Sequence, residues 1–323
     1  MSYAEQFDET RKKRFRDQGK LAAGYYKSMM REHVTEIDCE GESDAPYLFY
    51  DPVKAQRASG RSQTNIDNPA KRRRRWLHYQ PDIESGELVD KADVFKGMQD
   101  YKSETMRVHY GAVSNGIDET IFDGILGDAY EGKLGSKVVT LPSRQLILPT
   151  FSKSGTTGAV GMTIDKIRES RKRFAAKRYN LNQYDIMLPL SSQQIDDLGD
   201  EEKLLSVEYR QQAGPEYSSE GKLARIWNHN IIEVEGAPLI QVDVDGTLTW
   251  VQRVPAYLKQ RVVLGVWEDV KEDAWPDTHK KNQLTMRVWA NMDCRRMEEA
   301  AVNEIQCLVP PEYVADIEEL EAA

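Results

Sequence analysis

Residues 90–127 read DKADVFKGMQDYKSETMRVHYGAVSNGIDETIFDGILG, and their apolar side chains recur mostly three, four or seven positions apart. That spacing places them on one side of an α-helix with about 3.6 residues per turn. A bend is expected near Gly116, because each glycine weakens a helix by about 1 kcal/mol relative to alanine. The pattern predicts one helix of nearly forty residues, or two shorter ones, with a buried stripe made of Phe95, Met98, Tyr101, Val108, Ala112, Ile117, Ile121 and Ile125.

The roughly ninety residues before this helix carry little pattern that could form a core. Residues 1–44 are a polar arm with a short basic helix expected at 5–30. Residues 45–87 hold two strand-like pieces, at 47–50 and 76–79, on either side of a polar middle with prolines, which predicts a long projecting hairpin. We expect both stretches to be completed by neighbouring chains.

After the long helix the sequence predicts a mixture of α and β structure. A second loop-rich ribbon is expected from short strands at 137–141 and 145–148. A helix capped by Thr163 and running to about 178 is followed by a buried strand at 185–189 and a short capped helix at 191–198. The last third is expected to be mainly antiparallel sheet, with strands near 223–227, 231–234, 240–251, 262–266, 284–290 and 303–308.

Composition limits the class of protein. The chain has 323 residues, enough for two or three domains, a net charge of −9 and 30% charged residues. It contains no apolar run near the eighteen residues of a membrane span and no secretory signal, so we expect a soluble protein. Its three cysteines are far apart, which favours reduced thiols over disulfides or a zinc site.

Charge is unevenly distributed along the chain. Residues 1–75 hold sixteen Lys and Arg against twelve Asp and Glu, a net of +4, which leaves −13 for the remainder. A basic run, KRRRR at 71–75, precedes Trp76, and an acidic tail follows from 311 to 323. Such a run could bind phosphate backbones and stack bases, or it could pair with an acidic neighbour. The negative total favours the second interpretation.

One segment resembles a catalytic motif. LIQVDVDGTLT at 239–249 is similar to the first motif of haloacid-dehalogenase-type phosphatases, in which Asp243 would be the nucleophile and Asp245 the proton donor. Those enzymes need further groups on a parallel sheet, and only 73 residues of mostly strand-like sequence follow Trp250. Alternating apolar residues around Asp245 and Gly246 instead predict a β-hairpin with a type I′ turn, and we favour the hairpin.

No other pattern indicates a reaction or a bound metal. The five histidines are far apart, the segment at 154–158 lacks the lysine of a phosphate-binding loop, and an EF-hand starting at Asp243 would have Leu248 and Val254 at two essential positions. We therefore predict no catalytic residue, no cofactor and no metal site.

Several segments together resemble tailed-phage major capsid proteins. They are RRRRWLHY at 72–79, GELVDKAD at 86–93 with the long helix, and IDETIFDGILGDAYEG at 117–132. The likeness continues through TIDKIRESRKRF at 163–174 and DIMLPLSSQQIDDL at 185–198 to the closing strands. This resemblance implies the α+β Hong Kong 97-type capsid fold, which encapsulin compartments also share. An encapsulin-like shell is therefore the alternative of the same class, and the phosphatase is the alternative of another class.

The resemblance also implies an order of parts along the chain. It assigns 1–44 to an N-terminal arm, 45–87 to an extended loop, 88–160 to a peripheral domain with its spine helix, 161–260 to an axial domain, 261–310 to strands returning to the peripheral domain, and 311–323 to the acidic tail.

By the same resemblance the protein would be no enzyme. It would assemble with itself into pentamers and hexamers of an icosahedral shell enclosing double-stranded DNA, in the host cytoplasm, and would reside in the virion without a membrane. Portal and scaffolding proteins, and a decoration protein, are the expected partners. The residues expected to contact adjacent subunits are Arg72, Arg73, Arg74, Arg75 and Trp76.

Overall fold

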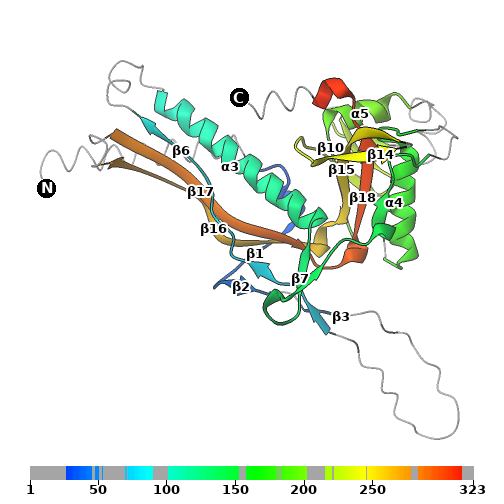
Figure 1. Ribbon diagram of the computed structural model, residues 1–323, viewed down its shortest axis with the longest axis horizontal. Coiled ribbons are helices and arrows are strands. Elements are labelled where there is room, and N and C mark those ends of the chain that lie inside the picture. Colours follow the sequence, from blue (N-terminus) through cyan, green and yellow to red (C-terminus); the bar gives the residue numbers. More distant parts are fainter. Residues whose placement is uncertain are drawn as a thin grey trace, which may run out of the picture.

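A computed structural model describes residues 27–45, 48–50, 53, 70, 72–89, 101–152, 158–179, 181, 183–201, 215–219, 222–244, 246–277 and 283–314. Two sheets contain most of the described strand residues, and α3 lies along one of them (Figure 1). Most of the helix expected at 5–30, the first part of the long helix and the tip of the expected hairpin lie outside the described residues.

Helix α3 (Tyr101–Leu126) confirms the described part of the long helix, although its buried side differs from the prediction. Val108 is 69% exposed and Ala112 is exposed as well, so both were placed wrongly in the stripe. The stripe has no slip near Gly116, because three- and four-residue steps lead through other residues to Ile117. Its described members are Met106, Tyr110, Val113, Ile117, Ile121, Phe122 and Ile125.

Glycine in α3 permits close packing on the sheet beneath it. A Cβ atom on Gly124 would lie 2.2 Å from the carbonyl oxygen of Cys294, and one on Gly116 would lie 2.7 Å from Cγ2 of Ile83. A larger residue at 124 would force the helix away from the backbone of the strand. Glycine at these positions lowers the intrinsic stability of the helix, but it permits the close contact between α3 and the sheet.

The first sheet has four strands in the order β1 (Thr35–Asp38), β16 (Val262–Asp277), β17 (Gln283–Arg296) and β6 (Ile83–Val89). Alternate residues of β17 point toward α3 and form one apolar core with it, from Met286 to Cys294. The strands predicted at 262–266 and 284–290 are confirmed but form a much longer hairpin. β1 covers only the beginning of β16, in parallel, at Val263 to Val266.

The second sheet has eight strands and a core of its own. Its order is β11 (Glu216–Tyr217), β12 (Leu223–Ile226), β13 (His229–Glu233), β10 (Ile186–Leu190), β15 (Thr247–Leu258), β18 (Val302–Leu308) and β9 (Leu146–Ile147), with β14 (Leu239–Val244) also pairing β15.

Pairing in this second sheet is mostly antiparallel, as expected, except for β10 with β13 and β18 with β9. The strand expected at 145–148 exists as β9, yet the second ribbon predicted from it is wrong. β9 joins this sheet because buried Ile147 packs into its core.

Two capped helices cover the second sheet. Thr163 accepts a hydrogen bond from the backbone of Lys166, as expected for the start of α4 (Ile164–Ala176). Ser191 and Gln194 form a capping box at the start of α5 (Ser192–Gly199). The side chain of Lys166 is fully buried, and Nζ donates to three carbonyl oxygens, those of Val160, Gly161 and Gln306, at 2.8 to 2.9 Å. This lysine therefore joins α4 to β18.

Three short ribbons complete the described fold. β2 (Ser43–Asp44) pairs β5 (Leu77–His78), and β3 (Leu48–Tyr50) pairs β4 (Arg72–Arg74). The two pairs follow one another, which confirms the predicted hairpin at its base. β7 (Ala129–Glu131) pairs β8 (Lys137–Val139) next to this base. Single 3-10 turns are η1 (Arg31–His33), η2 (Lys133–Gly135), η3 (Ser143–Gln145), η4 (Lys259–Arg261) and η5 (Glu299–Ala301).

His229 is a core histidine that makes stability depend on pH. Its Nδ1 lies 3.0 Å from the carbonyl oxygen of Trp227, and Nε2 lies 3.3 Å from Oγ of Ser170. Complete burial lowers the pKa of His229 to about 4, despite the hydrogen bond to Trp227. In the unfolded chain His229 becomes protonated near pH 6.5, whereas in the folded chain it stays neutral until about pH 4. The free energy of unfolding therefore falls as pH falls from 6.5 to 4.

We expect the free energy of unfolding to lose about 2–3 kcal/mol between pH 7 and pH 4.5 through His229 alone. A His229→Gln variant should lose this part of the pH dependence, because glutamine does not titrate. Urea unfolding of the unassembled chain at both pH values measures it. Equal pH dependence in the two proteins would contradict the assignment.

Candidate interaction surfaces

Arg72, Arg73 and Arg74 form strand β4, and all three side chains are exposed. With Glu131 and Gly132 they line a surface hollow of about 460 Å³, called here the basic hollow. Glu131 already has three cations close to it, at 3.6 Å from Arg73, 3.0 Å from Arg75 and 3.5 Å from Lys137. The three arginines give this hollow a basic lining around Glu131.

Arg75 differs from the three arginines before it because its side chain is completely buried. Nε donates to the carbonyl oxygen of Met297 at 3.1 Å, and the two Nη atoms meet the carboxylates of Glu131 at 3.0 Å and Glu299. These partners lie in β7 and in the turn from β17 to β18, between the two sheets. Arg75 thus fastens the base of the hairpin to the rest of its own chain.

Trp76 also contacts its own chain. Its backbone N–H donates to the carbonyl oxygen of Tyr130 at 3.0 Å, and its indole Nε1 donates to that of Gly132 at 2.5 Å. The run at 72–76 therefore separates into three exposed arginines and two anchoring residues. Sequence alone could not separate Arg75 from the three arginines before it, because all four are the same residue in one basic run.

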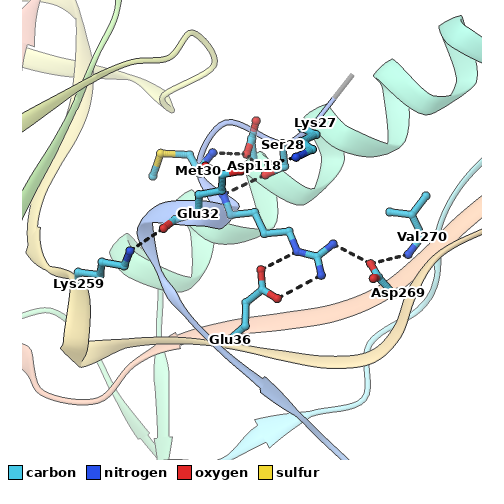
Figure 2. A network of polar contacts seen from close by, with 10 residues as sticks. Lys27, Ser28, Met30, Glu32, Glu36, Asp118, Lys259, Asp269 and Val270 are labelled. Atoms are coloured by element: carbon cyan, nitrogen blue, oxygen red, sulfur yellow. Dashed lines mark hydrogen bonds and ion pairs between the residues drawn. The ribbon is translucent and has the colours of Figure 1, made fainter. Parts of the chain in front are cut away.

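Asp118 holds the first described residues of the N-terminal segment against α3 (Figure 2). This carboxylate on α3 is buried, and it accepts hydrogen bonds from Ser28 Oγ at 2.5 Å, Met29 N at 3.1 Å and Met30 N at 3.0 Å. Burial raises the pKa of Asp118, and the three hydrogen bonds offset this only in part. Sequence reasoning missed this anchor, although a carboxylate next to Ile117 on the buried side of a helix is a signal for one.

A second set of contacts holds the same segment against the four-stranded sheet (Figure 2). Arg31 lies 2.7 Å from both Glu36 and Asp269, and Nζ of Lys259 donates to the carbonyl oxygen of Glu32 at 2.7 Å. Burial acts to raise the pKa of Asp269, yet hydrogen bonds from Arg31 and from the backbone of Val270 bring it below its ordinary value. The segment from 27 to 36 is therefore anchored to α3 and to β16.

The face of the four-stranded sheet away from α3 carries tryptophans. Trp275, Trp289, Lys271, Asp273 and Arg287 share this face by their register, and we call them the outer tryptophan face. Trp275 is 40% exposed, and the guanidinium of Arg287 lies 5.0 Å from the ring centroid of Trp289. In the described part of the chain these five side chains remain exposed or half-buried. Exposed aromatic side chains on a broad sheet are typical of protein interfaces.

Asp243 lies on a hairpin, as we favoured. β14 pairs with β15 from Leu239 opposite Gln252 to Val244 opposite Thr247, and a two-residue turn joins the strands. The carboxylate of Asp243 accepts a hydrogen bond from the backbone N–H of Gly246 at 2.9 Å. Asp245 lies outside the described residues. The side chain of Asp243 is exposed, so it serves the turn.

The three cysteines are buried free thiols, and burial raises the pKa of each. Among the described residues no group of three His, Cys, Asp or Glu side chains could hold a metal ion. Within the same residues no helix has the length and apolar character to cross a bilayer.

Comparison with protein families identifies a phage family. The family described as phage capsid protein matches residues 7–309, which is nearly the whole chain. No curated protein matches this sequence.

Several solved phage capsids have a similar fold. The capsid of Ralstonia phage GP4 is 11% identical and superimposes with a TM-score of 0.63 over 88% of this chain and 92% of that chain. The acid-stable capsid of Helicobacter pylori bacteriophage KHP30 is 11% identical, with a TM-score of 0.61 over 85% and 87%. The mature capsid of bacteriophage PhiM1 is 12% identical, with a TM-score of 0.59 over 87% of each chain. At such low identity these likenesses establish the fold.

Proposed function

Because this chain belongs to the phage capsid protein family and is a major capsid protein of the head shell, we propose that its copies assemble as pentamers and hexamers that exchange arms and loops. Its fold is the Hong Kong 97-type capsid fold, and its role is structural and not enzymatic. The alternative of a phosphatase using Asp243 is therefore wrong.

The parts of the subunit take the following roles in this proposal. Residues 1–44 are the arm, 45–87 the extended loop, 88–160 the peripheral domain with its spine helix, and 161–260 the axial domain. The return strands are β16 and β17, paired with β1 and β6, whereas β18 pairs with β15. We accordingly place the boundary of the return segment near 297 instead of 310.

The outer tryptophan face is the observation that most supports loop exchange. The sheet is covered by α3 on one face, and the tryptophan exposed on its other face offers a partner an aromatic surface. An extended loop from an adjacent subunit has suitable chemistry, because residues 47–50 are aromatic and apolar and 71–75 are basic. Burial of such loops between subunits supplies the core that the arm and loop lack within one chain.

The three exposed arginines of β4 are proposed to contact an acidic group of an adjacent subunit. Arg72 and Arg74 point to the same side of the strand, because side chains alternate along it. Arg75 and Trp76 position β4 for this contact, because both side chains are bonded to other parts of their own chain. The net charge of −13 beyond residue 75 provides many acidic partners.

Reversal of this charge should impair assembly. Replacing Arg72 and Arg74 by glutamate is expected to reduce the yield of closed shells or capsomer rings by about tenfold or more, since like charges at an interface are costly. Electron microscopy and sedimentation of the purified chain measure the yield.

A matched control tests whether the change in net charge alone reduces assembly. Lys172 and Lys222 have side chains that are 73% and 66% exposed, and replacing both by glutamate changes the net charge equally. Normal shell yield from the Arg72 and Arg74 variant, or an equal loss from the control, would contradict the proposed contact.

Further partners belong to the same proposal. The shell would enclose double-stranded DNA, and the negative body of the subunit would limit adhesion of DNA to the inner wall. Portal and scaffolding proteins, and a decoration protein, would contact the assembled subunits. Assembly in the host cytoplasm accords with the three free thiols.

A further inference from the structure

Helix α4 concentrates positive charge in an otherwise acidic part of the chain. Residues 163–178 hold seven Lys and Arg against two Asp and Glu, a net of +5, whereas the chain beyond residue 75 carries −13 in total. Some of these cations serve the fold, because they donate to carbonyl oxygens of other segments: these are Lys166, Arg173 and Lys177. Three others, Arg168, Arg171 and Lys172, lie on the outer side of the helix, and we call them the basic face of α4.

The basic face is open to a large partner. Its residues are three or four positions apart, or adjacent, so they share one side of the helix. The side chains of Arg168 and Lys172 are 43% and 73% exposed. Ala175 and Ala176 on the next turn are exposed as well, and their small side chains leave room beside the helix. Figure 1 shows α4 on the side of the second sheet that is away from α3 and the four-stranded sheet.

Two carboxylates of α4 itself lie near the basic face. Nη1 of Arg168 is 4.0 Å from Asp165, and Nζ of Lys172 is 3.6 Å from Glu169. Both pairs join residues three apart on the helix, at distances that are long for an ion pair. Exposed pairs of this kind contribute little to stability, so a phosphate group can take the place of either carboxylate at small cost.

Trp227 contacts two arginines of the basic face from a strained turn. This two-residue turn joins β12 to β13, and both of its residues have positive φ, +46° at Trp227 and +65° at Asn228. Bulky residues rarely adopt this conformation, and those that do are concentrated at functional sites. The turn places the centroid of the indole ring 5.3 Å from Cζ of Arg168 and 5.5 Å from Cζ of Arg171. These cation–π contacts orient both guanidinium groups before any ligand binds.

We propose that the basic face of α4 binds the phosphate backbone of double-stranded DNA, and that Trp227 positions its two arginines. This inference rests on the proposed enclosure of DNA by the shell, and it identifies the part of the subunit that touches the genome. Guanidinium groups bind phosphates in a bidentate geometry, and lysine adds a point charge. A duplex carries phosphates along its whole length, so it can lie against the open side of a helix without a groove. The acidic remainder of the subunit would confine the contact to this face.

The salt dependence of DNA binding tests this contact. The unassembled chain is titrated onto a fluorescently labelled duplex, and anisotropy gives the association constant between about 50 and 200 mM salt. Replacing Arg168, Arg171 and Lys172 by glutamine should weaken binding about tenfold or more at the lower salt concentration. It should also reduce the slope of log K against log salt by about 2–3, because each phosphate contact contributes about 0.9.

A matched control removes three exposed lysines from other parts of the molecule. Lys137, Lys222 and Lys271 have side chains that are 70%, 66% and 53% exposed, and their replacement by glutamine changes the net charge equally. This control should leave the slope unchanged. An unchanged slope in the basic-face variant, or an equal decrease in the control, would overturn the proposal.

The positioning role of Trp227 has a separate signature. Trp227→Gly keeps every charge and suits the positive φ of the turn, but it removes the ring that orients the arginines. We expect affinity to fall about threefold or more with the salt slope unchanged, because the number of phosphate contacts stays the same. Unaltered affinity would refute this role.

Shell formation separates this inference from the proposed assembly. The contact with DNA is not needed to join subunits, so the basic-face variant should form shells in normal yield. Loss of shells from this variant, with normal yield from the lysine control, would show that the face meets another subunit and would overturn the DNA contact. If the unaltered chain binds DNA as expected but forms no shells, the proposed assembly fails and the DNA contact stands.

Discussion

Replacing Arg75 by methionine is expected to lower the free energy of unfolding by about 3–5 kcal/mol, the largest loss that we anticipate from one side chain. The guanidinium is completely buried and has polar partners at Glu131, Glu299 and the carbonyl oxygen of Met297. Methionine fills similar space but removes the donor to Glu299 and to the carbonyl oxygen of Met297, and leaves Glu131 with Arg73 and Lys137 only. Removal of one partner from a buried ion pair is costly because the other charge stays buried.

The effect should also reach the contact between subunits. Arg75 is the residue that joins the base of the extended loop to the turn between the two sheets, so its loss should displace β4 and reduce shell yield. Urea unfolding of the unassembled chain measures the stability, and Arg74→Met is the matched control because Arg74 is exposed. A loss below about 1 kcal/mol for Arg75→Met, or equal losses for both variants, would show that Arg75 is not an internal anchor.

Replacing Asp118 by alanine is expected to release the start of the N-terminal arm and to cost about 2–3 kcal/mol. Three donors, Ser28 Oγ, Met29 N and Met30 N, would lose their acceptor. The cost is smaller than for Arg75, because burial of the Asp118 carboxylate is itself unfavourable and raises its pKa. A carboxyl group with a raised pKa loses stabilising effect as pH rises through that pKa, so the contribution of Asp118 should fall as pH rises.

Cleavage by trypsin reports directly on the arm. Lys27 and Arg31 lie on either side of the Asp118 contacts, and Arg31 is held by Glu36 and Asp269. In the Asp118→Ala variant we expect cleavage after both residues to accelerate by about tenfold or more, following the population of the open state. Glu119→Ala is the control, because Glu119 is exposed on the next position of the same helix. Unchanged cleavage in the Asp118 variant would refute the anchoring role.

Much of the fold could be predicted from local pattern. The period of apolar residues identified α3, the caps at Thr163 and Ser191 marked α4 and α5, and Asp245 with Gly246 marked the turn of the β14–β15 hairpin. Each signal depends on residues within one or two turns of the chain. The order of these pieces carried the resemblance to phage capsid proteins, and the family comparison confirmed it.

Contacts between distant segments decided what local pattern could not. Val108 and Trp275 are apolar in any context, yet both are exposed, since nothing in the described fold packs over them. Arg74 and Arg75 are adjacent in one basic run, and only the carboxylates of Glu131 and Glu299, far along the chain, make one of them an internal anchor. Burial is a property of three-dimensional neighbours, whereas periodicity is a property of the chain. Helices, caps and turns could therefore be predicted from the sequence, whereas the contact surfaces could be identified only from the tertiary structure.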